Sequence, residues 1–184
     1  DCIARAFANF ASQRPRPAYL EIPLDMLIQP AGEGWTARAL PSAAAPSASL
    51  IEQAVKKLDA ASSPVIVLGG GALHAGKAAI AIAEKLKAPI ITTTAGKGAV
   101  PADHPLCLGY VMGRKACWDM LAKSDAILCA GSELSETDFW NDDIVIDRSL
   151  IRIDIDPSAM SRPHTAEIAI LGDAGQALEA IAAG

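Results

Sequence analysis

The chain has 184 residues, of which 51% are hydrophobic and 20% are charged, and its formal net charge is −5. This length and apolar content predict one main domain with additional segments and a core of ordinary size. The acidic balance provides no basic field, so we expect no nucleic-acid partner. No apolar run approaches the roughly 20 residues of a membrane span, so we expect no membrane partner either.

The cysteines and the first residues indicate the setting of the protein. None of the four cysteines has C-x-x-C spacing, which predicts no metal site and reduced thiols in a cytoplasmic protein. Residues 1–14 lack the basic start and apolar block of a signal peptide. The sequence begins without Met, and we expect it to be a fragment of a longer protein.

The first 49 residues differ in pattern from the rest. Residues 2–13 carry apolar side chains at helical spacing, and residues 18–23 read as a short strand that ends at a proline. Residues 30–49 are rich in Pro, Ala, Ser and Gly and show no lasting period, which is typical of a linker.

The remaining residues alternate between buried strands and helices. Continuous apolar runs such as residues 64–68 (PVIVL) are typical of strands that are buried on both faces. Strands are expected over residues 64–68, 89–93, 126–130, 150–155 and 167–171, with a further short one over 143–146, and helices over 49–61, 74–87, 113–123 and 174–182. A long loop is expected over residues 95–112. This alternation predicts an α/β fold with a parallel sheet and helices on both faces.

Ligands of such sheets bind beyond the carboxyl ends of the strands. The first strand is followed by Gly69, Gly70 and Gly71, a turn that could hold a phosphate beside the next helix or could simply be a tight connection. It departs from the G-x-G-x-x-G dinucleotide motif, because His74 stands in the last position. The second strand is followed by Thr93, Thr94 and Gly96, whose hydroxyls and flexible backbone could line a groove.

The loops after the next two strands are acidic. Gly131, Ser132 and Glu133 begin a polar loop that could accept hydrogen bonds from a ribose or could be a solvated turn. Asp154 and Asp156 point to the same side of their strand and could contact a nucleotide or cap a turn. No Ser-His-Asp set or metal-ligand cluster is visible, so no catalytic residue is predicted in this chain.

The order of five stretches resembles a known family, the thiamine-diphosphate-dependent enzymes of the acetolactate synthase, benzoylformate decarboxylase and oxalyl-CoA decarboxylase group. The stretches are residues 16–25, residues 64–71, residues 88–101 together with Asp103-His104-Pro105, residues 124–131 and residues 151–156. The resemblance implies that residues 1–29 are the tail of the preceding pyrimidine-binding domain, that 30–49 are a linker, and that 50–184 are the central domain. It also implies a Rossmann-like, doubly wound, mainly parallel sheet of six strands.

In some members of this family the central domain carries FAD or ADP, and in others it binds no nucleotide. The resemblance places the nucleotide at the strand exits named above. FAD-binding members are usually basic after the third strand, whereas this chain has Glu133, Glu136 and Asp138 there, and acids repel a pyrophosphate.

The thiamine diphosphate and Mg²⁺ of this family are bound by the pyrimidine- and diphosphate-binding domains. The family's Gly-Asp-Gly motif is not matched, because Gly172-Asp173 is followed by Ala174. We therefore expect these sites outside the chain, with the two missing domains as partners and a homo-oligomer, a dimer or a tetramer, for the whole protein.

The expected function is that of the central domain of a 2-oxo-acid decarboxylase or carboligase, inactive by itself, which scaffolds the catalytic domains and could hold FAD or ADP. The first alternative is a purely structural domain with a vacant pocket. The second is a self-standing NAD-dependent enzyme.

Overall fold

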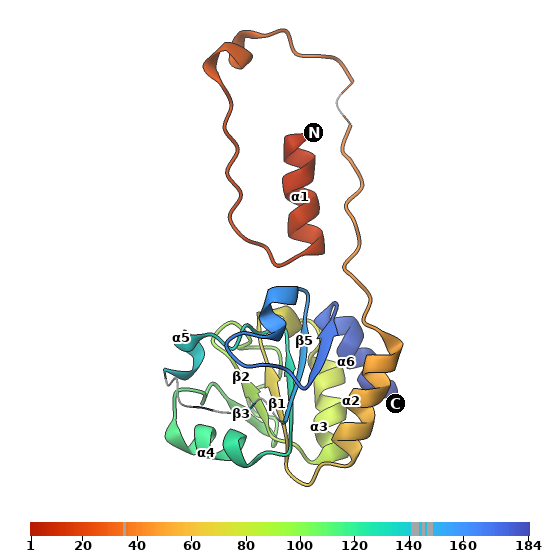
Figure 1. Ribbon diagram of the computed structural model, residues 1–184, viewed down its shortest axis with the longest axis vertical. Coiled ribbons are helices and arrows are strands. Elements are labelled where there is room, and N and C mark those ends of the chain that lie inside the picture. The colour runs from red at the N-terminus through yellow and green to blue at the C-terminus, as the bar shows by residue number, and fades with distance from the viewer. Residues whose placement is uncertain (35, 141–143, 145, 147–148) are drawn as a thin grey trace. The chain divides into compact units, whose positions relative to one another are not determined.

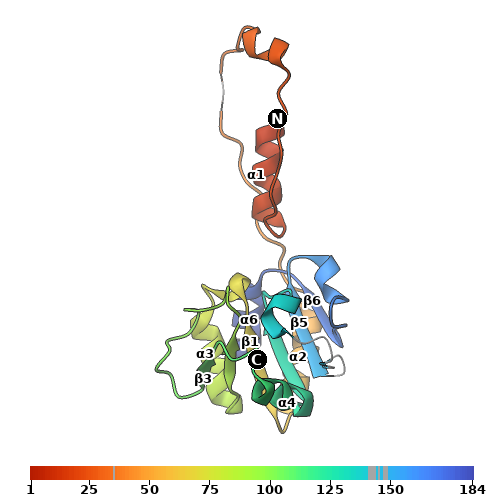
Figure 2. The ribbon, with the colours of Figure 1, turned by 90° about the vertical axis from the view of Figure 1, so that its left-hand side faces the viewer.

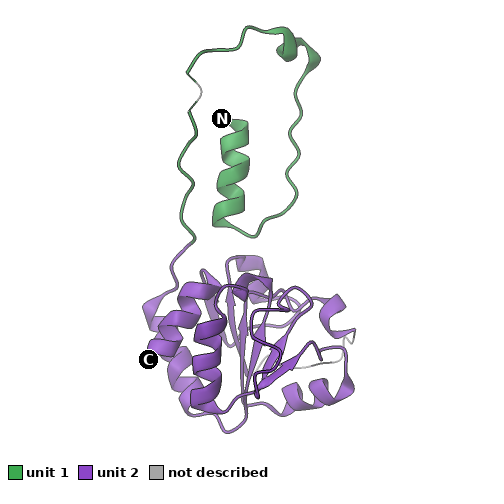
Figure 3. Ribbon diagram, turned by 180° about the vertical axis from the view of Figure 1, so that it is seen from behind, with its two compact units in different colours: residues 1–43 green, residues 44–184 purple. Residues whose placement is uncertain are grey.

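The computed structural model describes residues 1–34, 36–140, 144, 146 and 149–184. It divides into two compact units, residues 1–43 and residues 44–184, coloured green and purple in Figure 3. The division falls within residues 30–49, for which the sequence predicts a linker. The assignment of residues 1–29 to a separate catalytic domain stays a prediction.

Unit 1, residues 1–43, contains the helix α1 (Cys2–Ser12) and a 3-10 helix (Leu24–Ile28). The rings of Phe7 and Phe10 meet edge to face, with their centroids 6.0 Å apart. The predicted strand over residues 18–23 is wrong, because the described residues of this unit form no sheet. A strand needs a partner for its backbone N–H and C=O groups, and none is provided within the unit.

Unit 2, residues 44–184, is built on a six-stranded sheet in the order β3-β2-β1-β4-β5-β6, and every neighbouring pair is parallel. The strands are β1 (Pro64–Leu68), β2 (Ile90–Thr92), β3 (Cys107–Gly109), β4 (Ala126–Ala130), β5 (Leu150–Asp154) and β6 (Ile168–Leu171). The predicted Rossmann-like, doubly wound architecture is confirmed. The short strand predicted over residues 143–146 lies partly outside the described residues.

Strand β3 lies within residues 95–112, for which the sequence predicts only a loop, so that prediction is wrong at Cys107–Gly109. The strand has only three residues, forms the edge of the sheet, and is partly exposed. Its pairing with β2 is irregular between Ile90 and Ile91. A strand this short, which ends in a glycine and lacks a buried face, has no apolar run that could reveal it in the sequence.

Helices cover both faces of the sheet, as Figures 1 and 2 show. They are α2 (Ala48–Asp59), α3 (Gly76–Leu86), α4 (Lys115–Lys123), the short α5 (Glu136–Phe139) and α6 (Ala174–Ala183). Side chains of α2, α3 and α6 pack on one face with Ile66 and Leu68, whereas side chains of α4 pack on the other face with Val65 and Val67. Alternate residues of β1 thus enter opposite core layers, which explains its unbroken apolar sequence.

Candidate functional site

The predicted site residues lie at one edge of unit 2, where the strands end. Leu68, the last residue of β1, pairs with Thr92 of β2 on one side and with Ala130 of β4 on the other. We call this edge, with the loops that follow β1, β2, β4 and β5, the strand-exit edge. The chain runs from β1 outward through β2 and β3 in one direction, and through β4, β5 and β6 in the other. The switch point, the usual ligand position of such folds, therefore lies between β1 and β4.

At the switch point, the glycine turn after β1 packs directly on Gly131, which follows β4. A Cβ atom on Gly69 would lie 2.2 Å from the carbonyl oxygen of Gly131, and a Cβ atom on Gly131 would lie 2.6 Å from the Cα atom of Gly71. Gly131 also has a φ of 66°, which side chains disfavour. These glycines therefore allow two backbones to approach each other closely.

Several main-chain N–H groups of this turn are paired within the protein. Gly69 donates to the carbonyl oxygen of Ala130 at 2.9 Å, and Gly71 donates to that of Gly131 at 3.1 Å. The next two N–H groups along the chain donate back into the same turn, at 3.1 and 3.3 Å. A phosphate cradle needs N–H groups that face the ligand. The N–H groups of Gly69 and Gly71 are therefore not directed at a ligand in this arrangement.

Helix α3 does not follow this turn directly. A 3-10 turn over Gly70–Ala72 comes first, and α3 begins at Gly76, after the predicted start at residue 74. A Cβ atom on Gly76 would lie 1.9 Å from the carbonyl oxygen of Ala99. The first turn of α3 thus lies against the main chain of the loop that follows β2.

The loop after β2 is fixed to the end of β1. The N–H of Thr93 donates to the carbonyl oxygen of Leu68 at 2.9 Å, and the N–H of Gly96 donates to the hydroxyl of Thr93 at 3.1 Å. A Cβ atom on Gly96 would lie 2.1 Å from the same oxygen of Leu68. Thr93 is buried, whereas the neighbouring Thr94 is exposed. The Thr93 hydroxyl therefore stabilises a turn.

The loop after β4 carries the acidic segment, which we define as residues 132–139. The hydroxyl of Ser132 accepts a 3.0 Å hydrogen bond from the N–H of Leu134, and the hydroxyl of Ser135 donates to the Asp138 carboxylate at 3.3 Å. Burial raises the pKa of the Asp138 carboxyl, whereas hydrogen bonds from Ser135 and from the main-chain N–H of Thr94 oppose the rise. The charge of Glu133 adds to the increase in this pKa.

Asp154 is the last residue of β5, and Asp156 follows the strand. Asp154 is buried, and its carboxylate accepts a 2.9 Å hydrogen bond from the N–H of Asp156. The Asp156 carboxylate accepts from the N–H and the hydroxyl of Ser158, at 2.9 and 2.7 Å. Asp156 therefore caps the 3-10 helix Pro157–Met160, the role that the sequence analysis gives as the alternative to ligand contact.

Arg152 of β5 is a buried residue that the sequence analysis misses. Its guanidinium donates to the carbonyl oxygens of Arg162 at 2.8 Å, His164 at 3.3 Å and Ser132 at 3.0 Å. It therefore joins the loop before β6 to the acidic segment. The signal in the sequence is the arginine in the middle of the buried strand LIRID. The other residues of this strand before the final aspartate are aliphatic.

The structure brings the predicted residues together in two groups. Gly69, Gly70, Gly71, Gly96 and Gly131 meet around the ends of β1 and β4, with the position for a Cβ atom of Gly70 3.2 Å from the Cβ atom of Ala95. Asp154 and Asp156 lie at and just beyond the end of β5, which is separated from β1 by β4. A nucleotide-binding role for any of these residues, and for Thr93, Thr94, Ser132 and Glu133, stays a prediction.

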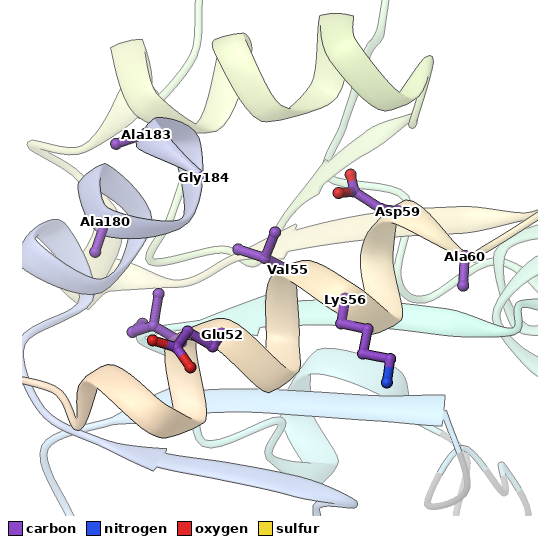
Figure 4. A pocket seen from close by; sticks show the side chains of 9 residues that line it. Glu52, Val55, Lys56, Asp59, Ala60, Ala180, Ala183 and Gly184 are labelled. Carbon is purple, nitrogen blue, oxygen red and sulfur yellow. The ribbon is translucent and has the colours of Figure 1, made fainter.

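A hollow lies between α2 and the end of α6, away from the strand-exit edge. It has a volume of about 790 Å³, and its lining includes Ile51, Val55, Ala180, Ala183 and Gly184. Figure 4 shows Val55 on the side of α2 that faces the end of α6, and the position for a Cβ atom on Gly184 is 3.2 Å from a methyl of Val55. Ala60 and three charged side chains of α2 (Glu52, Lys56 and Asp59) complete the lining. This aliphatic surface suits packing rather than chemistry.

Within residues 1–34, 36–140, 144, 146 and 149–184, no group of three or more His, Cys, Asp or Glu side chains is arranged to hold a metal ion. Among the helices that the structure describes, none combines the length and the apolar character that a membrane crossing requires.

Known proteins with similar sequences point to one family. Residues 51–181 match the model of the thiamine pyrophosphate enzyme central domain. The chain is 41% identical over 183 residues to a protein of Pseudomonas aeruginosa described as "Probable 2-ketoarginine decarboxylase AruI", an alignment that covers 98% of this chain and 33% of that protein. It is 31% identical over 185 residues to the acetolactate synthase large subunit of Corynebacterium glutamicum, covering 96% of this chain and 30% of that protein.

The similarity extends to three-dimensional structure. A solved structure from Mycobacterium smegmatis, described as a "putative thiamin diphosphate-dependent enzyme", superimposes with a TM-score of 0.80 at 27% identity, over 98% of this chain and 36% of that one. The chain spans about a third of the length of the curated relatives that it matches. The sequence match and the parallel six-stranded sheet agree, and the chain belongs to the thiamine pyrophosphate enzyme family, whose central domain it contains.

Proposed function

We propose that this chain is the central part of a thiamine-diphosphate-dependent 2-oxo-acid decarboxylase or carboligase, in which it holds the catalytic domains in place. When bound, thiamine diphosphate supplies the stabilisation of the carbanion that decarboxylation leaves behind. The chain itself would contribute a rigid α/β body and the connection to the preceding domain. In isolation it would be inactive.

The observation that carries the proposal is the extent of its similarity to a protein named as a decarboxylase. The alignment covers 98% of the chain, whereas the central-domain model begins only at residue 51. The first 50 residues are therefore shared with that relative as well. This supports a parent protein with the same order of domains and a 2-oxo acid as its substrate.

Gly172-Asp173-Ala174 is the stretch compared above with the family's Gly-Asp-Gly diphosphate motif, and its aspartate has a structural role in this chain. The carboxylate of Asp173 accepts a 2.9 Å hydrogen bond from the N–H of Gln176 and thereby caps α6. The N–H of Asp173 donates to the carbonyl oxygen of Ala44 at 2.9 Å. These contacts support the proposal that thiamine diphosphate and Mg²⁺ are held by parts of the protein beyond this chain.

Unit 1 supports the proposed partners, the pyrimidine- and diphosphate-binding domains. Its apolar side chains are largely open to solvent, and Tyr19, Leu24 and Ile28 are 88%, 83% and 85% exposed. Exposed apolar surface of this kind marks a contact with other protein. We propose that the preceding catalytic domain covers these side chains and that the whole protein forms a homo-oligomer.

Binding of FAD or ADP is not favoured as a second function. The N–H groups of Gly69 and Gly71 donate to main-chain oxygens of the protein, and Gly131 packs directly against the glycine turn. A structural domain without a nucleotide agrees better with this geometry.

The test compares the full-length gene product with the 184-residue chain. Each is assayed with thiamine diphosphate, Mg²⁺ and a panel of 2-oxo acids that includes 2-ketoarginine, pyruvate and benzoylformate. We expect cofactor-dependent decarboxylation by the full-length protein alone, and light scattering should show it as a dimer or tetramer. Turnover by the isolated chain, or no turnover of any 2-oxo acid by the full-length protein, would refute the proposal.

A further inference from the structure

We infer that, in the parent protein, the residues that follow Gly184 lie in the hollow between α2 and the end of α6. The inference rests on the proposed function, in which a further catalytic domain is joined to Gly184. The hollow then has one occupant, the segment that connects Gly184 to that domain. Because the chain spans only about a third of the curated relatives that it matches, a parent protein of the same build has ample chain for such a connection.

The hollow is a fixed feature of unit 2, because α2 is held on both sides. Ala54 of α2 is buried in the same core layer as Leu178 and Ile181 of α6, and the two helices are in contact. Helix α2 is also joined to α3, since the carboxylate of Asp59 lies 3.3 Å from the Nζ atom of Lys85. A movement of α2 that filled the space of about 790 Å³ would break these contacts.

Small residues at the end of α6 leave this space open. Ala180 and Ala183 are exposed, and they line the hollow together with Val55, which is half-buried on α2. Ile51, one turn before Val55, extends the aliphatic wall. Apolar side chains placed over this wall would remove it from water, which is favourable. The surface therefore suits a segment that carries apolar residues.

The end of α6 leads the chain toward this surface. Gly184 follows the last helical residue, and its N–H donates to the carbonyl oxygen of Ile181 at 3.3 Å. A glycine at this position commonly ends a helix and turns the chain, and an apolar residue just beyond it packs on the last helical turns, where Ala180 lies. The position for a Cβ atom on Gly184 is 3.2 Å from a methyl of Val55. The following residues would thus leave the helix beside the wall of the hollow.

The polar groups of the hollow disfavour a small molecule as its occupant. Sites for small molecules combine apolar walls with a few polar groups that converge on the ligand. The charged side chains here are Glu52, Lys56 and Asp59, and all three belong to α2. The Asp59 carboxylate is already paired with Lys85. Polar groups on a single helix do not enclose a ligand, whereas they suit the solvated side of a peptide segment.

The test is disulfide trapping in the full-length gene product. The accessible cysteines of this chain, Cys2 and Cys107, are first replaced by serine. A cysteine is then placed, one at a time, at each of about six residues that follow Gly184, a stretch that spans roughly 20 Å when extended. Each is combined with Val55→Cys or with Ala180→Cys, which place the second cysteine in the hollow. Because Ala180 is exposed, its variant keeps the test decisive if Val55→Cys does not fold.

The matched controls are Gln53→Cys on α2 and Glu179→Cys on α6, two exposed positions outside the lining of the hollow. A disulfide needs two Cα atoms within about 7 Å of each other. We therefore expect an intramolecular cross-link to Val55→Cys and to Ala180→Cys from at least one of the scanned positions, and loss of the cross-link in both controls. Mass spectrometry of the digested protein identifies the linked peptides.

Three results would overturn the inference. They are the absence of any cross-link to the hollow, cross-links that form as readily with the controls, and cross-links that join only two copies of the protein. The decarboxylase assay remains a separate measurement. Decarboxylation without the cross-link would refute only this inference, whereas the cross-link without decarboxylation would refute only the proposed function.

Discussion

The guanidinium of Arg152 donates a 3.0 Å hydrogen bond to the main-chain oxygen of Ser132, and this contact joins β5 to the segment that follows β4. The same guanidinium binds the carbonyl oxygens of Arg162 and His164 in the loop before β6. A buried cation of this kind organises main chain that has no regular ladder of its own. Two loops of the strand-exit edge thus depend on one side chain.

Replacement of this arginine by an apolar residue of similar length should destabilise unit 2. Arg152→Met removes the donor from three carbonyl oxygens, of which that of Ser132 is buried and the other two are partly buried, and we expect a loss of about 3 kcal/mol in the free energy of unfolding. Urea denaturation followed by circular dichroism measures this loss. The control Arg114→Met changes an exposed arginine and should cost less than about 0.5 kcal/mol. Equal midpoints for both variants would show that the Arg152 contacts contribute little.

Two alanine substitutions can separate the energetic effect of the close contact at Gly131 from the effect of its positive φ. Gly131 and Gly98 have φ values of 66° and 91°, but only at Gly131 would a Cβ atom meet neighbouring backbone, at 2.6 Å from the Cα atom of Gly71. Gly98→Ala should cost about 1 kcal/mol, the usual penalty of that conformation. Gly131→Ala should cost about 2 kcal/mol more, because it also overpacks the turn. Both values come from denaturant unfolding, and a similar loss for the two variants would contradict the close approach.

Much of the fold could be predicted because its signals are local. The apolar runs of β1 and β4 are continuous, since both faces of these strands are buried. Strand β3 could not be predicted, because its three partly exposed residues gain their structure only from pairing with β2. The strand expected over residues 18–23 is wrong for the converse reason. Its sequence favours a strand, but the described residues of unit 1 provide no other strand to pair with it.

The candidate site was harder to predict, because one residue type serves two purposes. A glycine that admits a phosphate and a glycine that admits another backbone both lack a Cβ atom, and the sequence alone does not distinguish them. At Gly69 and Gly131 the neighbour is backbone, at 2.2 and 2.6 Å from an added Cβ. Asp156 shows the same ambiguity, since a carboxylate after a strand suits a ribose or a helix cap, and here it caps Pro157–Met160.

The cap of α6 provides a test of the role assigned to Asp173. Its carboxylate accepts a hydrogen bond from the N–H of Gln176, whereas Ser47, the corresponding residue of α2, makes no such bond. Asp173→Ala should therefore lower the free energy of unfolding by about 1 kcal/mol, and Ser47→Ala should change it by only a few tenths. Calorimetric titration of the wild-type chain with Mg²⁺ should show no binding. A calorimetric signal that Asp173→Ala abolishes would instead identify Asp173 as a metal ligand.

The ionisation of Asp138 should make the stability of unit 2 depend on pH. Burial, the largest effect, raises the pKa of this carboxyl above its ordinary value of 3.8, and Glu133 acts in the same direction against the hydrogen bonds from Ser135 and Thr94. A folded-state pKa above the unfolded value means that stability is greatest below the unfolded pKa and falls as the pH rises through the folded pKa. The free energy of unfolding of the wild type, relative to Asp138→Asn, should therefore increase as the pH is lowered from 7 to 4.

Asp125 provides the control with the opposite sign. Hydrogen bonds from the N–H groups of Ser62 and Ser63, at 2.7 and 2.9 Å, hold the pKa of its carboxyl below the ordinary value of 3.8. Its contribution is present above the unfolded pKa and is lost as the pH falls through the folded one. The wild type, relative to Asp125→Asn, should lose stability on acidification below about pH 4, where an unperturbed aspartate begins to protonate. Two difference curves of opposite slope are expected from urea titrations between pH 3 and 7. A flat curve for Asp138→Asn would show that the Asp138 carboxylate is solvated in the folded protein.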